Sequence, residues 1–235
     1  MTEPQVTADT PLSKLPNFDP RAVPVIGIDG HLPAVPREAL SPDAIRQRFA
    51  APPRWEPEVW LERKFADREP AQASVLVAIV MRERPTILLT ERTTHLSTHS
   101  GQVAFPGGKA DPTDADAAHT ALREAQEEIG LAPSLVEVVG TLPTYTTGTQ
   151  FIITPVVALV RPDHRLAINA FEVADAFEVP LDFLMNPRHH HRHAFEWGGV
   201  RREWFSMPYM DGLTERFIWG ATAGMLRNFY RFLAA

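Results

Sequence analysis

The stretch FPGGKADPTDADAAHTALREAQEEIGL, residues 105–131, joins a paired-glycine loop to an acidic helix. When residues 116–129 are placed on a helix, their apolar side chains fall on one stripe, as packing against a core requires. That stripe consists of Ala118, Ala121, Leu122, Ala125 and Ile129. Asp114 and Asp116 are candidates for the N-cap, and Gly130 is typical of the residue that ends a helix. The pattern therefore predicts one amphipathic helix with defined ends.

Three glutamates, Glu124, Glu127 and Glu128, crowd the last turn of this helix. Like charges three and four residues apart repel each other, and acids at a helix C-terminus face the negative end of the helix dipole. Arg123 is the neighbouring cation, so a divalent ion would relieve the remaining repulsion. Carboxylates at this spacing suit Mg²⁺, and the paired glycines allow the backbone to approach an ion or a phosphate. A solvated acidic helix face is the alternative interpretation.

The segments around this stretch are predicted to form a mixed sheet. SVLVAIVM (74–81) and TILLTER (86–92) are apolar, β-branched runs separated by RERP, which predicts a hairpin. Further strands, all extending the same sheet, are expected in VEVVGTL (136–142), FIITPVVALV (151–160), FEVADAFEVPL (171–181), HAFEW (193–197) and VRREWFSM (200–207). The segment IWGATAGMLRNFYRFLAA (218–235) has apolar residues at helical spacing and is expected to close the fold as a helix. Strands and helices without regular βαβ alternation indicate an α+β protein with a mixed-sheet sandwich.

Residues 1–60 hold eleven of the 22 prolines, which disfavour regular strands and helices. We therefore expect an irregular N-terminal arm, residues 1–70, in front of a domain of residues 71–235. One short helix is predicted within the arm, with Ser41 as its N-cap and Pro42 in its first turn. Apolar side chains late in the arm indicate that it packs on the domain or on a second subunit: Trp55, Val59, Trp60, Leu61 and Phe65.

The composition argues against several classes of partner and site. The net charge is −6 and no long basic run occurs, which disfavours a nucleic-acid partner. The chain has no cysteine, so disulfides and thiolate metal sites are excluded. No apolar stretch reaches the length of a membrane span and the N-terminus has no apolar signal core, so we expect a cytoplasmic protein without a membrane partner. A homodimer is one option for its oligomeric state.

A histidine-rich segment, RHHHRH (residues 188–193), has the composition of a metal tract. It follows Asn-Pro and precedes a predicted strand, and loops of this kind are commonly polar. We therefore expect it to be an exposed loop at the entry to a hairpin.

The run GG…REAQEEIGL, within residues 107–131, resembles the signature of the Nudix hydrolases. That signature is a glycine, five residues, a glutamate, seven residues, and then Arg-Glu-apolar-any-Glu-Glu-any-Gly-apolar. Its second half is matched by Arg123, Glu124, Ala125, Glu127, Glu128, Gly130 and Leu131. In its first half, Asp114 stands at the glutamate position and is separated from Arg123 by eight residues. The resemblance implies an α/β/α sandwich with a mixed central sheet, and cleavage of a nucleoside diphosphate linked to another group.

The upstream segment LLTERTTHLSTHSGQVAFPGG, residues 88–108, is similar to an additional signature of the coenzyme A diphosphatase branch of this family. The matching residues are Leu88, Leu89, Thr90, Arg92, Gly101, Phe105, Pro106, Gly107 and Gly108. Thr93 replaces a usual Ser or Ala, and Ser97 stands where a second arginine is expected. The resemblance implies hydrolysis of coenzyme A or its derivatives to 4′-phosphopantetheine and 3′,5′-ADP.

The resemblance also implies roles for single residues. Glu124 and Glu128 would be the main ligands of Mg²⁺ or Mn²⁺, with Glu127 as a ligand or water-orienting group. The Gly107 carbonyl matches a position that often completes the ion's shell, and Arg123 would steady the glutamates through an ion pair. The residues expected to contact the substrate are Arg92, Gly101, Phe105 and Gly108.

The general base need not lie within the signature. Glu172, in NAFEVADAF before a late strand, is the candidate, and an exposed turn acid is the alternative. Two other functions stay open. One is hydrolysis of another pyrophosphate, such as ADP-ribose or a dinucleotide, which the substitution at Ser97 favours. The other is a non-catalytic nucleotide-binding module, which would be marked by loss of the glutamates that this chain retains.

Overall fold

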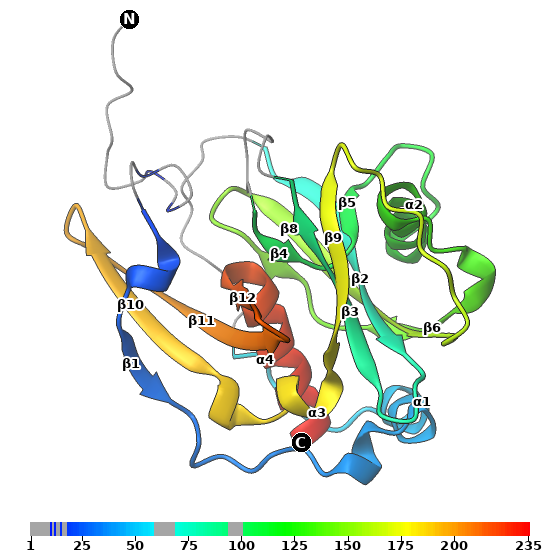
Figure 1. Cartoon of the computed structure of the whole chain (residues 1–235), viewed down its shortest axis with the longest axis horizontal. Helices are drawn as coiled ribbons and strands as arrows, with labels where there is room; N and C mark the ends of the chain where they lie inside the picture. Colours follow the sequence, from blue (N-terminus) through cyan, green and yellow to red (C-terminus); the bar gives the residue numbers. More distant parts are fainter. Residues whose placement is uncertain (1–9, 11, 13–14, 16–17, 59–68, 94–100) are drawn as a thin grey trace, which may run out of the picture.

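The computed structural model describes residues 10, 12, 15, 18–58, 69–93 and 101–235 of the chain. Their strands form two β-sheets, and helices pack between and beside the sheets (Figure 1). Several residues named above lie outside the described residues: Val59, Trp60, Leu61, Phe65 and Ser97.

The larger sheet is mixed, as expected. Its strands are β2 (Ala71–Val80), β3 (Thr86–Arg92), β4 (Val103–Ala104), β5 (Gly107–Lys109), β6 (Val136–Thr141), β7 (Tyr145–Thr146), β8 (Phe151–Val160) and β9 (Val173–Pro180). The order β4-β3-β2-β8-β6 forms its main path, while β5, β7 and β9 pair with β2, β8 and β3. The predicted hairpin is β2–β3, with Ala78 opposite Leu88. Only β2 and β8, among the described pairs, run parallel.

Helices cover both faces of this sheet. Leu76, Ala78 and Val80 contact the apolar stripe of α2 (Ala117–Ile129), whereas Val77 and Ile79 belong to the core that includes α4 (Gly220–Ala234). Successive side chains of a strand point to opposite faces, so a strand covered on both sides carries a continuous apolar run. This arrangement confirms the α/β/α sandwich.

The last strands form a separate sheet, which corrects the expectation of one continuous sheet. Its order is β1-β10-β11-β12. The bounds are β1 (Val25–Ile28), β10 (His191–Trp197), β11 (Val200–Asp211) and β12 (Thr214–Trp219). The start of the predicted closing helix, Ile218 and Trp219, belongs to β12, and α4 begins at Gly220. Figure 1 shows α4 between the two sheets, and the apolar cluster around it includes Phe205 of β11 and Ile79 of β2.

The N-terminal segment is more regular than the prolines suggested. β1 pairs antiparallel with β10, so the expectation of an arm without sheet structure was wrong at Val25–Ile28. The predicted helix is present as α1 (Pro42–Ala50), and the Ser41 hydroxyl accepts a hydrogen bond from Ala44 N–H at 3.3 Å. Leu40 and Ile45 are buried in the core shared with α4. The division of the chain at residue 70 stays a prediction.

Short helical segments complete the described chain. They are α3 (Leu181–Leu184) and four 3₁₀ turns at Pro20–Ala22, Arg37–Leu40, Pro133–Leu135 and Pro187–His189.

The histidine segment is not an exposed loop, contrary to expectation. His190 is fully buried and His193 is 3% exposed. His190 Nε2 donates to the Leu184 carbonyl at 2.7 Å, while His193 lies between the Val23 carbonyl and the Ser206 hydroxyl at 2.9 and 2.8 Å. Polar rings tolerate burial when both nitrogens have partners, and a single sequence does not reveal those distant partners.

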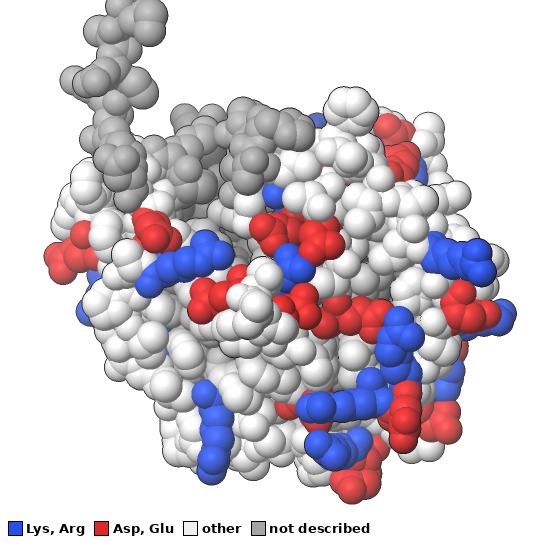
Figure 2. Space-filling model, in the orientation of Figure 1, with Lys and Arg blue, Asp and Glu red and all other residues white. Residues whose placement is uncertain are grey.

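Acidic and basic side chains alternate over the face shown in Figure 2, and the described residues on that face form no continuous basic surface. None of the helices in the described part of the chain is long and apolar enough to cross a membrane.

Candidate active site

The acidic helix α2 has the ends that its sequence predicts. The Asp116 side chain accepts a hydrogen bond from His119 N–H at 2.8 Å, and Gly130 ends the helix in the left-handed conformation. The three glutamates differ in burial, however. Side-chain exposure is 59% at Glu127, 16% at Glu124 and 4% at Glu128. One acid therefore faces solvent and two are withdrawn from it.

Paired glycines make room for the two withdrawn carboxylates. Gly107 N–H donates to Glu128 Oε2 at 3.0 Å. A Cβ at Gly107 would lie 2.4 Å from the Ser74 carbonyl oxygen, and a Cβ at Gly108 would lie 2.4 Å from Glu124 Oε2. Both distances are far below van der Waals contact. At Gly107 the clash is with backbone and excludes a side chain, whereas at Gly108 it is with the end of the Glu124 side chain, which would have to move. The glycines allow β5 to lie directly against α2.

Arg123 joins the acids to the loop before the helix. Its guanidinium donates to both Asp114 oxygens, from Nε at 3.0 Å and from Nη2 at 2.9 Å. Nη1 donates to Glu124 at 2.9 Å and to Glu127 at 3.2 Å. The Arg123 guanidinium holds the pKa of Asp114 well below its usual range. Asp114, whose role the sequence left open, therefore orients the arginine that contacts two of the glutamates.

A distant loop covers the C-terminus of α2. Ala167 N–H and Asn169 N–H donate to the carbonyls of Ile129 and Glu128, both at 2.8 Å. These bonds satisfy acceptors that a helix leaves unpaired at its end. The same loop leads to Glu172, and the Asn169 side-chain amide donates to Glu172 Oε1 at 3.3 Å.

Burial sets the protonation of the withdrawn acids. Desolvation raises the pKa of Glu128 to about 7, with the charges of Glu124 and Glu172 adding to the effect. The Gly107 N–H and the Arg92 guanidinium, whose Nη1 is 3.6 Å from Glu128 Oε1, lower that pKa. Desolvation also raises the pKa of Glu124. The charge of Glu172 is thus near enough to raise the pKa of both Glu124 and Glu128.

Mg²⁺ and Mn²⁺ bind charged carboxylate oxygens. A divalent cation would therefore stabilise the charged form of Glu124 and Glu128, which burial otherwise disfavours. In the described part of the chain, no group of three or more His, Asp or Glu side chains is already gathered as an ion site. Glu124 is instead turned toward Arg123, and Glu128 toward Gly107. An ion would compete with these partners for the same oxygens.

A large cavity of about 730 Å³ opens at Gly107, and none of the three glutamates of α2 lines it. Predicted site residues on its wall are Arg92, Phe105, Gly107 and Gly108, joined by Lys109. Phe105 is only 3% exposed and belongs largely to the core. Gly101 does not line the cavity: its N–H donates to the Arg92 carbonyl at 3.2 Å, and its φ of 65° makes the turn before β4.

The cavity extends to the second sheet, which the sequence did not connect with the site. Residues from that part of the wall are Arg201, Trp204, Phe205, Trp219, Gly220 and Ala221. The segment FIWGATAGML (217–226), which also resembles members of the branch, contains Trp219, Gly220 and Ala221, but none of the six was predicted as a site residue. Asp114 could be noticed through its place in the signature and as an N-cap candidate. The bond from Asn169 N–H to the Glu128 carbonyl gives no sequence signal, because the two residues lie far apart along the chain.

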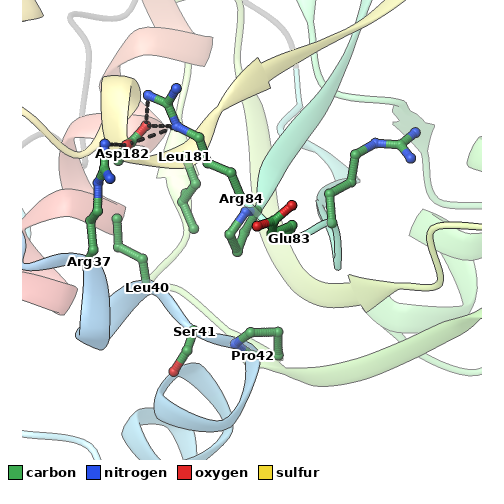
Figure 3. A pocket seen from close by; sticks show the side chains of 10 residues that line it. Arg37, Leu40, Ser41, Pro42, Glu83, Arg84, Leu181 and Asp182 are labelled. Carbon is green, nitrogen blue, oxygen red and sulfur yellow. Dashed lines mark hydrogen bonds and ion pairs between the residues drawn. The ribbon is translucent and has the colours of Figure 1, made fainter.

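A smaller hollow of about 350 Å³ lies at the β2–β3 turn (Figure 3). Arg84 donates two bonds to Asp182 Oδ1, from Nη2 at 2.6 Å and from Nε at 3.0 Å, and Arg37 lies 3.3 Å from Oδ2 of the same acid. Since both arginines are already paired with Asp182 in a partly exposed ion pair, we assign the hollow no chemical role.

Known proteins resemble this chain over the same region. A family model described as the NUDIX domain matches residues 70–198. The uncharacterized Nudix hydrolase NudL of Escherichia coli (strain K12) is 44% identical over 158 residues, which cover 67% of this chain and 80% of that protein. NudL of Shigella flexneri is 43% identical over 172 residues, which cover 72% of this chain and 87% of that protein. Among solved structures, the match to a C. elegans Ap4A hydrolase binary complex covers 50% of this chain and 85% of the hydrolase chain. The sequence identity is 18% and the TM-score is 0.41.

Proposed function

Because the chain belongs to the Nudix family of hydrolases, we propose that it cleaves the diphosphate of coenzyme A or a derivative into 4′-phosphopantetheine and 3′,5′-ADP. The coarser activity, hydrolysis of a nucleoside diphosphate derivative, follows from membership of the family. The narrower substrate is the proposal.

One contact supports this proposal more than any other. Arg92, from the segment similar to coenzyme A diphosphatases, lines the cavity and lies 3.6 Å from the buried carboxylate of Glu128. The branch segment and the acidic helix therefore meet at one place. A guanidinium there can pair with a phosphate oxygen in bidentate geometry.

The chain's own residues prepare the site for a diphosphate. The Gly107 N–H of β5 holds Glu128, and Gly108 lets the backbone of β5 lie against Glu124 without a Cβ between them. Arg123, held by Asp114, fixes the orientation of Glu124. Restricting these carboxylates before substrate arrives lowers the reorganisation that the reaction needs.

Glu124 and Glu128 would hold Mg²⁺ or Mn²⁺, with Glu127 and the Gly107 carbonyl as further ligands. When bound, such an ion neutralises charge on the diphosphate oxygens and lowers the pKa of a coordinated water. Glu172 is proposed as the group that accepts a proton from the attacking water. Its support is its place on the loop that covers α2 and its electrostatic effect on both buried acids.

Product analysis tests the proposal. Coenzyme A, ADP-ribose and a dinucleotide are incubated with metal-free protein supplemented with Mg²⁺, Mn²⁺ or chelator. We expect coenzyme A to yield 4′-phosphopantetheine and 3′,5′-ADP only when metal is present, at the highest kcat/KM of the panel. A thermal scan of the same protein should show a higher Tm with metal, because binding to the folded state stabilises it. Faster cleavage of ADP-ribose or a dinucleotide would contradict the choice of substrate.

A second candidate, hydrolysis of another pyrophosphate, rests on Ser97, which replaces the second arginine of the branch pattern. The same panel decides between the two.

A further inference from the structure

Arg216 of β12 connects the second sheet to the larger one. Its Nη1 donates to Glu91 of β3 at 2.7 Å, and its Nη2 donates to Asp175 of β9. A third acid, Asp211 at the end of β11, accepts from Nε at 3.3 Å and from Nη2 at 3.2 Å. The bonds to Glu91 and Asp175 therefore cross between the sheets, whereas the bonds to Asp211 stay within the β11–β12 hairpin.

The Arg216 guanidinium is withdrawn from solvent. Its side chain is 10% exposed, and the guanidinium lies over the Phe177 ring of β9 at 4.1 Å from the ring centroid. Ion pairs on an open surface hold their geometry weakly, whereas charge-assisted bonds of a desolvated guanidinium are short and directional. Arg216 therefore fixes where the second sheet meets β3 and β9.

The two strands that Arg216 holds are irregular directly beyond the bonded acids. Glu91 lies opposite Asp175, but the next residue of β3, Arg92, lies opposite Val173. One residue of β9 is thus left over between the two pairs, as in a β-bulge, and bulges next to active sites redirect a side chain. Arg216 holds the last regular pair before the bulge at Arg92.

Glu91 and Arg92 contact opposite sides of the larger sheet, as successive strand residues do. Glu91 is bonded to Arg216, while Arg92 Nη1 lies 3.6 Å from Glu128 Oε1 of α2 and Arg92 lines the cavity. A displacement of Glu91 would move Arg92 with it, because the two residues are adjacent in the chain. The bonds of Arg216 on one side of the sheet therefore act on a guanidinium on the other side.

We propose that Arg216 is a positioning residue for Arg92: by holding Glu91 and Asp175, it keeps the Arg92 guanidinium where it contacts a phosphate of the substrate. The inference rests on the proposed function, which gives Arg92 that contact. Arg216 does not line the cavity, so it acts through Arg92 and not on the substrate. It also lies beyond residues 70–198, which the family model matches, so the second sheet contributes to hydrolysis from outside that region.

Steady-state kinetics test the inference with whichever of coenzyme A, ADP-ribose and the dinucleotide is cleaved fastest. We expect Arg216→Met to lower kcat/KM by about 10- to 30-fold, because small misplacements in an active site are costly. The control is Arg82→Met, which removes two bonds to Glu178, farther along β9 from Arg92. Arg82→Met should keep kcat/KM within about twofold of wild type. Wild-type kcat/KM in Arg216→Met would overturn the inference.

A double-mutant cycle separates positioning of Arg92 from a general loss of structure. Once Arg92→Ala has removed the guanidinium, Arg216→Met should lower kcat/KM by less than about twofold, because coupled residues are not additive. A further tenfold loss or more in the double variant would show that Arg216 acts by another route, and the inference would be wrong.

The three acids around Arg216 supply a matched series. Asp175→Asn and Glu91→Gln each weaken a bond between the sheets and should lower kcat/KM by about three- to fivefold. Asp211→Asn removes the same charge from the same guanidinium but weakens only bonds within the hairpin, so it should change kcat/KM by less than about twofold. If Arg216→Met does not fold, this series decides, and equal kcat/KM in all three variants would refute the role.

A measurement without turnover separates this inference from the proposed function. The NMR signal of the Arg92 Nε–H group, identified by its loss in Arg92→Lys, reports on the surroundings of the guanidinium. We expect this signal to move in Asp175→Asn and to stay in place in Asp211→Asn. If no substrate is cleaved, the proposed function fails, and an unmoved signal in Asp175→Asn still overturns the positioning role. If a substrate is cleaved while Asp175→Asn changes neither signal nor kcat/KM, hydrolysis stands and the positioning role is wrong.

Discussion

Glu128 keeps a carboxylate at 4% side-chain exposure, where its charged form is destabilised unless a cation compensates it. Arg92 at 3.6 Å and the Gly107 N–H compensate it only in part, since the pKa of Glu128 is still raised to about 7. The residue combines a destabilising charge with a position beside the cavity. That combination is typical of a group retained for function.

Glu128→Gln should therefore lower activity and raise stability. Loss of the charge removes a metal ligand, so kcat/KM should fall by about two to four orders of magnitude, or roughly 3–5 kcal/mol. A carboxyl whose folded pKa is raised stabilises the fold below its unfolded pKa, and that contribution is lost as pH rises toward the folded value of about 7. In metal-free protein the variant should thus gain about 2–3 kcal/mol of unfolding free energy at pH 8 and little at pH 5.

Urea unfolding at both pH values and steady-state kinetics measure the two effects of Glu128→Gln. Glu83→Gln, at an exposed acid in the β2–β3 turn, is the control that should change neither. Near-normal turnover in Glu128→Gln would mean that the acids crowd this helix turn for a reason other than catalysis.

Gly108 lies against Glu124, and a residue with a side chain at position 108 would displace that carboxylate. In Gly108→Ala the new Cβ would lie 2.4 Å from Glu124 Oε2, the end of a flexible side chain, so the chain should fold while Glu124 moves. We expect kcat/KM to fall by about 10- to 100-fold, because small misplacements in an active site are costly. Gly27→Ala, where a Cβ has no neighbour within 4 Å, is the matched control. Full activity in Gly108→Ala would show that the position of Glu124 is not critical.

At the level of elements, a buried histidine directly before β10, His190, contacts α4. Arg227 Nη1 of α4 donates to His190 Nδ1 at 3.1 Å, and His190 Nε2 donates to the Leu184 carbonyl. Burial, with the nearby charge of Arg227 adding to its effect, lowers the pKa of His190 to about 4. The ring is therefore neutral in the folded protein and is protonated mainly after unfolding.

This histidine predicts a loss of stability in acid. A base whose folded pKa is lowered contributes stability that is fully present above its unfolded pKa of about 6.5 and is lost as pH falls toward 4. We expect wild type to lose up to about 3 kcal/mol more than His190→Gln between pH 7 and pH 4.5. Urea denaturation at several pH values measures the difference, with His31→Gln, at an exposed position, as control. Parallel pH profiles for wild type and His190→Gln would contradict the prediction.

Across the whole molecule, a buried ion network joins the N-terminal segment to α4. Arg227 is 1% exposed and lies 3.0 Å from Asp29 and 2.7 Å from Glu58. Asp29 follows β1, and Glu58 lies near the end of the described segment 18–58. The network therefore couples the first strand to a helix near the C-terminus.

Removing the central cation should loosen that connection. Arg227→Met removes the buried partner that Asp29 and Glu58 share, and Arg192 stays bonded to both acids. The loss of the buried guanidinium should reduce the unfolding free energy by about 3 kcal/mol. Arg231→Met, on the same helix but 44% exposed and 3.8 Å from Glu58, should cost less than about 1 kcal/mol. Hydrogen exchange should rise in β1 of Arg227→Met before it rises in β2. Equal losses in both variants would argue against a buried network.

The sequence by itself determined the features that depend on near neighbours. The ends of α2, the Ser41 cap of α1 and the β2–β3 hairpin follow from periodicity and capping within a few residues. Such signals are readable because backbone sterics and local hydrogen bonds act within one or two turns. The signature in residues 107–131 likewise lies on one short segment, so the acidic helix could be assigned to a metal-dependent hydrolase.

Only the tertiary structure decided how distant segments meet. It paired β1 with β10, divided the late strands from the main sheet, and buried His190 and His193. It also separated the roles of three adjacent glutamates, because burial of Glu128 depends on Gly107 and on the loop that carries Asn169. The contacts that decide these outcomes include bonds between residues 21 positions apart, Gly107 and Glu128, and 170 positions apart, Val23 and His193. The residue pattern of a strand predicts that the strand will pair, but it does not predict the neighbouring strand. The packing of the whole chain determines that neighbour.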